Sequence, residues 1–147
     1  MALAERRAEA VWQGDLTAGS GMVTGGSGAL GTLPITWAAR VERPDGKTSP
    51  EELLAAAHAA CFAMALSNTL KKVGTPPERL TVDAVCALER TDTGVKITTM
   101  QLQVRGRVPG LDQSGFVSAA QQAEQGCPVS NALRNNVQIS LDAALEG

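Results

Sequence analysis

The chain has 147 residues, of which 44% are hydrophobic and 19% charged, and these values predict one soluble globular domain with a single core. A formal net charge of −2 offers no basic face for phosphates, and 3% aromatic residues offer few stacking platforms, so we expect no nucleic-acid partner. The amino terminus mixes charges and lacks a secretory signal. The apolar run around His58 is interrupted by that residue and too short to span a bilayer, so we expect no membrane partner. An odd number of cysteines, three, favours a reducing, cytoplasmic setting.

Residues 8–40 contain short β-prone segments punctuated by glycines, which predict an antiparallel meander with strands near 10–12, 21–24 and 33–40. The glycine-rich segment 25–28 lacks the Gly-Lys-Ser/Thr ending of a phosphate loop, so we interpret it as a hairpin turn. Arg40 ends the third predicted strand, and the alternation there does not fix the direction of its side chain.

The best helix start follows a turn at residues 44–46. Ser49 is a suitable N-cap, Pro50 suits the first helical position, and Glu52 stands three residues after the cap. We predict a helix over residues 50–72, stopped by Gly74. Because its central turns are apolar on every side, it must be covered all round. A chain of this size has few elements for that purpose, so we infer that a second subunit completes the cover in a homodimer.

Strands are predicted over 80–89 and 95–108, a helix over 114–124, a short helix opening at Cys127, and a last strand over 137–141. This order predicts an α+β fold in which helices pack on an antiparallel sheet. Cys86 shares the apolar face of its predicted strand with Val82, Ala84 and Leu88, so we interpret it as a core residue.

The other two cysteines lie in different surroundings. Cys61 stands about three turns into the long predicted helix, where burial makes a thiol inert unless a cation offsets the loss of solvation. Cys127 directly precedes Pro128 at a predicted helix start, where the helix dipole and unpaired backbone N–H groups favour the thiolate. Local sequence therefore nominates Cys127 as the activated thiol, and it leaves open that both cysteines are packing residues of a non-catalytic ligand-binding dimer.

His58 lies three residues before Cys61, so the two side chains can be neighbours on one helix face. They would form the nucleophilic pair of a hydrolase or acyltransferase, or His58 is a hydrogen-bonded packing residue. One histidine without clustered cysteines cannot complete a zinc site, and we expect neither a metal nor another cofactor. Glu51 lies roughly 15 Å along a straight helix from Cys61. It cannot touch the thiol there, but it could hold an arginine that does.

Two cysteine motifs carry a resemblance to a known family. The first motif is the run from Ser49 to Leu66, which reads Ser-Pro-Glu-Glu-Leu-Leu and then Ala-Ala-His-Ala-Ala-Cys-Phe-Ala-Met-Ala-Leu, and the second is Gly-Cys-Pro-Val-Ser at 126–130. Together with the opening Trp-x-Gly-Asp at 12–15, they resemble the OsmC/Ohr family of osmotically inducible and organic hydroperoxide resistance proteins. The resemblance extends over about residues 8–145. It implies an intertwined homodimer with its active sites at the subunit interface, and thiol-dependent reduction of organic hydroperoxides.

The same resemblance implies roles for individual residues. Cys61 corresponds to the cysteine that attacks the peroxide, Cys127 to the resolving cysteine, and Glu51 to the glutamate that orients a catalytic arginine. Residues 17–32 contain no arginine, whereas Arg40 matches the arginine of the OsmC branch, in which we place the chain. Arg40 should therefore lie within reach of Cys61 and stabilise its thiolate. An external dithiol would reduce the Cys61–Cys127 disulfide. The expected pocket residues are Leu54, His58, Phe62 and Met64.

Overall fold

The computed structural model of the protein describes residues 1–146. Contacts within the chain divide it into two units, one ending at Leu53 and the other beginning at Leu54, and each unit is described by itself. Each unit contains a three-stranded sheet, so the α+β class is confirmed, but the strands form two small sheets instead of one.

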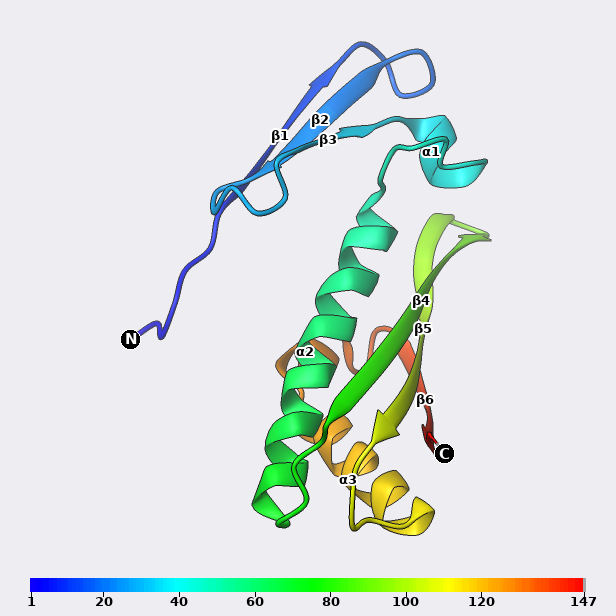
Figure 1. Cartoon of the computed structure of the whole chain (residues 1–147). Helices are drawn as coiled ribbons and strands as arrows, with labels where there is room; N and C mark the ends of the chain where they lie inside the picture. The colour runs from blue at the N-terminus through cyan, green and yellow to red at the C-terminus, as the bar shows by residue number, and fades with distance from the viewer. Residues whose placement is uncertain (147) are drawn as a thin grey trace. The chain divides into compact units, whose positions relative to one another are not determined.

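The first unit is built on the predicted meander (Figure 1). Strands β1 (Ala8–Gln13), β2 (Ser20–Gly25) and β3 (Thr32–Ile35) pair antiparallel in chain order. The glycine-rich segment between β2 and β3 is a turn, as predicted, with the Gly28 N–H donating to the Gly25 carbonyl. Gly28 adopts a φ of 85°, which a residue with a Cβ atom rarely reaches.

The third strand is shorter than predicted, because the chain turns into helix α1 (Trp37–Val41). Thr36 is its N-cap, and the Thr36 Oγ1 accepts a hydrogen bond of 3.1 Å from the Ala39 N–H. The alternation that suggested a strand as far as Arg40 covered too few residues to outweigh this cap. The prediction that Arg40 lies on a strand was therefore wrong: it lies in the last turn of a short helix.

Helix α2 (Pro50–Lys72) has the predicted bounds. The Ser49 Oγ accepts a 3.1 Å hydrogen bond from the Glu52 N–H, while the Glu52 carboxylate accepts one from Thr48 Oγ1 at 2.6 Å. Gly74 lies just beyond the end of the helix, where it adopts a φ of 89° and its N–H donates to the Lys71 carbonyl. Local capping chemistry thus fixes both ends of α2.

The sheet of the second unit contains β4 (Arg79–Thr91), β5 (Gly94–Arg107) and β6 (Gln138–Leu145). β4 and β5 pair antiparallel, but β5 and β6 pair parallel, so the prediction of a wholly antiparallel sheet was wrong. The reason is the helical connection between β5 and β6, through α3 (Gln113–Gly126) and α4 (Pro128–Leu133). It returns the chain to the end of the sheet at which β5 began, as a parallel pair requires.

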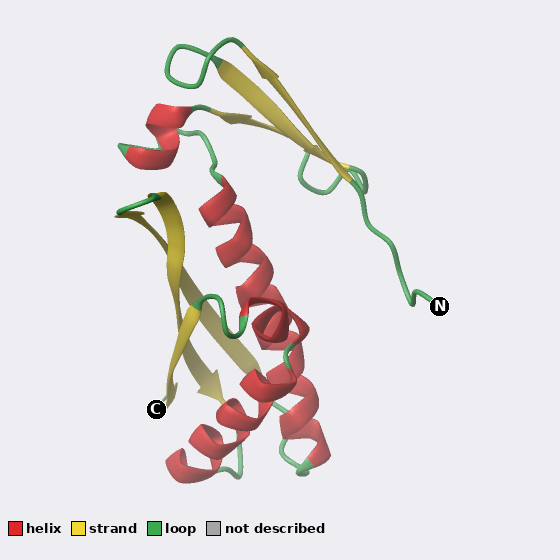
Figure 2. Cartoon of the chain, turned by 180° about the vertical axis from the view of Figure 1, so that it is seen from behind, coloured by secondary structure: helices red, strands yellow, loops and turns green. Residues whose placement is uncertain are grey.

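Helices α2 and α3 lie on the same face of this sheet (Figure 2). The core between them is made by buried side chains of α2, β5 and α3, and Cys86 packs against it from β4, as predicted. Gly106 of β5 lies under the Phe116 ring of α3, where an added Cβ would come within 2.6 Å of a ring carbon. The principal members of the core are Phe62, Leu66, Leu70, Met100, Leu102, Val104, Phe116 and Ala120.

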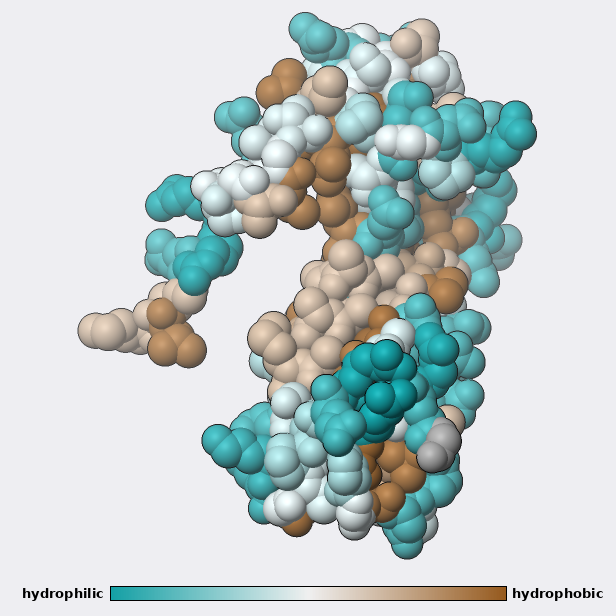
Figure 3. All heavy atoms as spheres, viewed as in Figure 1, coloured by the Kyte–Doolittle hydropathy of each residue, from teal (hydrophilic) through white to brown (hydrophobic). Residues whose placement is uncertain are grey.

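The opposite face of α2 is apolar and uncovered in the single chain. It carries Ala56, Ala57, Ala60 and Met64, and Met64 is 69% exposed. Figure 3 shows this face as a band of weakly hydrophobic surface along α2. Contrary to the expectation from the interrupted apolar run, α2 is long and apolar enough to cross a membrane by length and composition alone. The central helix of a soluble protein also meets that criterion.

Candidate active site

The fold brings the thiols of Cys61 and Cys127 into contact. Cys61 lies half-buried on α2, and Cys127 is fully buried as the N-cap of α4, with Pro128 in the first helical turn as predicted. Cys127 lies close enough to Cys61 to raise the pKa of the Cys61 thiol, through a side-chain hydrogen bond and through charge. Two cysteines from distant parts of the sequence therefore lie where one sulfur can reach the other.

The environment of Cys61 acts on its pKa in opposing directions. Burial is the largest effect and raises the pKa of the Cys61 thiol, and the hydrogen bond with Cys127 adds to the increase. The backbone N–H of Val129, in the first turn of α4, donates to the Cys61 sulfur and lowers that pKa. The sequence had associated the start of this helix with the activation of Cys127. In the structure, one of the N–H groups in the first turn of this helix donates to Cys61.

Arg40 and Glu51 form a two-pronged ion pair within the first unit. Arg40 Nε lies 2.9 Å from Glu51 Oε1, and Arg40 Nη2 lies 2.8 Å from Glu51 Oε2. Glu51 is buried, and its hydrogen bonds raise the pKa of Arg40 above the ordinary value. The Arg40 guanidinium also lies 5.9 Å from the centroid of the Trp37 ring. Glu51 thus holds the Arg40 side chain in one orientation, with the guanidinium against the Glu51 carboxylate and only partly exposed to solvent.

A pocket of about 280 Å³ lies beside Arg40 in the same unit. Most of its wall is apolar, and Arg40 provides its charge. Trp12 and Leu16 are exposed large hydrophobic residues, 38% and 55% accessible. Sequence reasoning did not assign these residues to a pocket, although Trp12 belongs to the motif that carried the family resemblance. The pocket is lined by Trp12, Leu16, Ile35, Thr36, Trp37, Arg40, Thr48 and Pro50.

The His58 side chain is hydrogen-bonded to Ser130. Its Nε2 lies 2.7 Å from the Ser130 Oγ, and both residues are fully buried. Its Nδ1 has no hydrogen-bond partner among residues 1–146. Burial is the largest effect on the pKa of His58 and lowers it. Because Nε2 is bonded to Ser130 and Nδ1 has no partner among these residues, neither ring nitrogen is hydrogen-bonded to the Cys61 thiol, as the pair of a hydrolase or acyltransferase would need.

The remaining predicted pocket residues lie in three different environments. Phe62 has no exposed surface and belongs to the core. Leu54 is partly buried against that core. Met64 is exposed on the uncovered face of α2. Phe62 therefore supports the packing beneath Cys61, and only Leu54 and Met64 have surface to offer a ligand.

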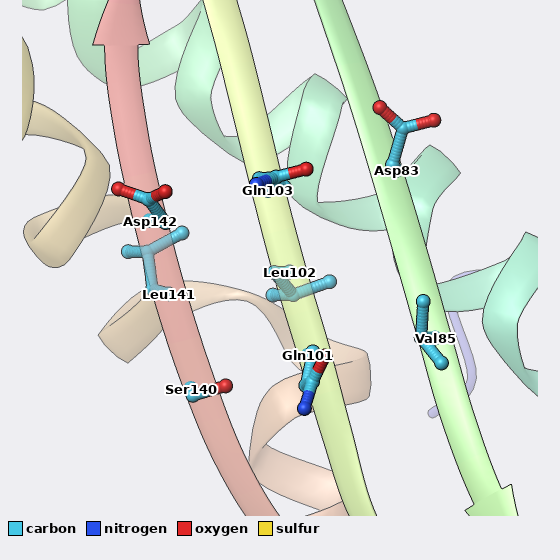
Figure 4. Close-up of a pocket in the computed structure, with 8 residues that line it drawn as sticks. All are labelled: Asp83, Val85, Gln101, Leu102, Gln103, Ser140, Leu141 and Asp142. Atoms are coloured by element: carbon cyan, nitrogen blue, oxygen red, sulfur yellow. The ribbon is translucent and has the colours of Figure 1, made fainter.

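A shallow hollow of about 210 Å³ lies elsewhere, on the solvent-facing side of the sheet of the second unit (Figure 4). Asp83, Gln103 and Asp142 occupy paired positions on its three strands. No cysteine is among the residues that line the hollow, so it offers no thiol for redox chemistry. Among residues 1–146, no three His, Cys, Asp or Glu side chains gather in a metal-binding group.

Comparison with protein families matches residues 43–142 to the OsmC-like protein family. Among characterised proteins, the chain is 41% identical to a peroxiredoxin OsmC of Escherichia coli, and the match covers 96% of each chain. It is 33% identical to an organic hydroperoxide resistance protein of Xanthomonas campestris pv. phaseoli, over 66% of this chain and 67% of that protein.

Solved structures share the fold. A crystal structure of an organic hydroperoxide resistance protein OsmC from Legionella pneumophila matches with a TM-score of 0.78 and 28% identity, covering 98% of this chain and 99% of that one. The organic hydroperoxide resistance protein OhrB of Bacillus subtilis matches with a TM-score of 0.74 and 27% identity, covering 93% and 97% of the two chains.

Proposed function

The chain belongs to the OsmC family, and we propose that it is a cysteine-based peroxidase that reduces organic hydroperoxides to alcohols. The observation that carries the proposal is the contact between the thiols of Cys61 and Cys127. The similarity to a peroxiredoxin over nearly the whole chain supports the same chemistry.

The proposed reaction has two steps. The Cys61 thiolate attacks the terminal oxygen of the peroxide, the O–O bond breaks, and the departing alkoxide takes up a proton to leave as an alcohol. Cys61 is thereby oxidised to a sulfenic acid. The Cys127 sulfur then attacks the Cys61 sulfur, which releases water and forms a disulfide. An external dithiol restores both thiols by exchange and is itself oxidised.

We assign the task of charge stabilisation to Arg40. Because burial raises the pKa of Cys61, the thiolate needs more help than the Val129 N–H provides. Arg40 would supply the positive charge and help to place the peroxide, with Glu51 fixing its orientation. The apolar pocket beside Arg40 would take the alkyl group, which favours organic over hydrogen peroxide. Leu54 and Met64 remain candidates for the same binding surface.

We further propose that the uncovered face of α2 binds a second copy of the chain. Its small alanine side chains allow close approach of another helix, and leaving Met64 69% exposed is unfavourable for a monomer. Met64→Glu should shift the protein from dimer to monomer in light scattering coupled to size exclusion. Val85→Glu, at a valine 58% exposed on the sheet of the second unit, is the matched control. A dimer that persists in Met64→Glu would contradict this interface.

We also propose the cytoplasm as the compartment, because its reducing conditions would supply the external dithiol that the reaction needs.

Intact mass spectrometry after one equivalent of cumene hydroperoxide tests the proposed function. The protein should lose two hydrogens as the disulfide forms, and Cys127→Ser should instead retain one oxygen on Cys61. Cys86→Ser serves as the control and should behave like the unsubstituted protein, because Cys86 packs against the core. Thiols that remain reduced would refute the peroxidase proposal and favour a non-catalytic ligand-binding dimer.

A further inference from the structure

We infer that the buried hydrogen bond between His58 and Ser130 is a positioning device that holds the two cysteines of the redox pair in register for disulfide closure. The inference rests on the proposed peroxidase function and adds two residues to it. It concerns the second chemical step, in which Cys127 must reach the oxidised Cys61.

The placement of the bond in the sequence is the first reason. His58 lies three residues before Cys61 on α2, and Ser130 lies three residues after Cys127, in α4. In a helix, residues three apart lie on one face, about one turn from each other. The single hydrogen bond of 2.7 Å therefore joins the turn that carries one thiol to the turn that carries the other.

The burial of the bond is the second reason. His58 and Ser130 both have no exposed surface, so neither group can exchange its partner for water. Removing one of them strands a buried polar atom, which is more costly than losing an exposed hydrogen bond. The ion pair between Arg134 and Glu124, 3.0 Å long, also acts on His58, with Glu124 favouring its protonation and Arg134 opposing it.

The chemistry of the ring defines what the bond can do. Because Nδ1 has no hydrogen-bond partner in the described part of the chain, we assign the ring proton to Nε2, which then donates to the Ser130 Oγ. In this arrangement neither ring nitrogen is hydrogen-bonded to Cys61, so the imidazole is not placed to remove its proton, and the neutral ring supplies no positive charge. Its role is mechanical: it keeps the start of α4 against α2.

Closure makes strict geometric demands. A disulfide forms only when the Cα atoms of the two cysteines lie about 4.4–6.8 Å apart and their side chains face each other. The first step, attack on the peroxide by Cys61, makes no such demand on Cys127. Loss of the His58–Ser130 bond should therefore slow the second step while leaving the first largely intact.

The experiment resolves the two steps. The reduced full-length protein is mixed with one equivalent of cumene hydroperoxide, quenched with acid at successive times and weighed intact. The gain of one oxygen reports sulfenic acid formation, and the later loss of water reports disulfide closure. In Ser130→Ala and His58→Leu we expect closure to slow about tenfold, so that the sulfenic acid accumulates, while its formation changes by less than about threefold.

Matched variants separate positioning from general stability. His58→Gln keeps an amide N–H that can donate to Ser130, and Ser130→Thr keeps the hydroxyl, so both should restore fast closure. The double variant His58→Leu/Ser130→Ala should close no more slowly than either single variant, because both remove the same bond. Ser118→Ala removes an exposed helical hydroxyl of α3 and should close at the unsubstituted rate.

Closure at the unsubstituted rate in both single variants would overturn the inference. Equal slowing of both steps would also overturn it, because that pattern indicates general loosening of the fold. If Ser130→Ala does not fold, His58→Leu decides the question: closure slowed in His58→Leu but not in His58→Gln supports positioning, and closure at the unsubstituted rate in His58→Leu overturns it. If the unsubstituted protein forms neither sulfenic acid nor disulfide, the peroxidase proposal fails first, and this inference fails with it.

Discussion

Substituting Glu51 by Gln tests the site at the point where the structure is most specific. The change keeps the size of the side chain but removes the negative charge that faces Arg40 at 2.8 and 2.9 Å. A hydrogen bond to a charged group contributes about 1.5–3 kcal/mol. The Arg40 side chain is 28% exposed and that of Glu51 only 10%, so water replaces part of the lost interaction for the arginine.

The lower end of that range for each of the two contacts gives about 3 kcal/mol, and solvent screening of the partly exposed arginine reduces this to about 1.5–3 kcal/mol in total. At about 1.4 kcal/mol for each factor of ten, kcat/KM for cumene hydroperoxide should fall about 10- to 100-fold. Steady-state turnover with a dithiol reductant measures this loss. The fall should be in kcat/KM, since a misdirected Arg40 affects both peroxide placement and the thiolate.

Glu52→Gln is the matched control for this experiment. Glu52 lies on the same helical turn, carries the same charge and is exposed, but it accepts its hydrogen bond from Thr48. Its substitution should change kcat/KM by less than about threefold. Equal losses in the two variants would show that the charge of the helix terminus matters and the ion pair with Arg40 does not.

Three further predictions follow from burial. The first concerns the rate at which iodoacetamide alkylates Cys61 in Cys127→Ser. Because burial raises the pKa of Cys61, this rate should rise with pH, and in the double variant Cys127→Ser/Arg40→Met it should still increase well above neutrality. A rate independent of pH would contradict this. His58, the only histidine, should titrate in NMR below its ordinary pKa of 6.5, and a midpoint at the ordinary value would refute this. Because the unfolded chain then binds the proton first as pH falls, the free energy of unfolding should decrease as pH falls through 6.5. Gly106→Ala should lower the unfolding free energy by about 1–3 kcal/mol through overpacking under the buried ring of α3, whereas Gly126→Ala, which meets no atom within 4 Å, should change it little in the same denaturant titration.

The parts of the fold that depend on neighbouring residues could be predicted from the sequence. Ser49, Pro50 and Gly74 specify the ends of α2 through local capping, so its bounds agree with the expectation. Arg40 was predicted to lie on a strand because Ile35, Trp37 and Ala39 alternate with a period of two, and the N-cap that Thr36 provides for α1 was not taken into account. A segment this short fits a helix or a strand equally well by its pattern, and only the capping residue before it favours the helix.

The features that depend on distant residues could not be predicted in the same way. The parallel pairing of β6 with β5 follows from the path of a helical connection, and the alternation within a strand carries no information on the direction of its partner. The hydrogen bond between His58 and Ser130 joins residues 72 positions apart. For His58, the sequence showed only that Cys61 was one turn away, and for Cys61 it could not reveal the Val129 N–H.

The contact between Cys61 and Cys127 also has a consequence for the unfolded chain. Oxidation of the pair would close a loop of about 66 residues, and a cross-link of that span removes about 4 kcal/mol of conformational freedom from the denatured ensemble. The oxidised protein should consequently resist heat and denaturant better than the reduced protein that awaits peroxide. Each turnover would then pass through a form that is harder to unfold, and an inhibitor of the external reductant would leave the cell with its more durable, inactive population.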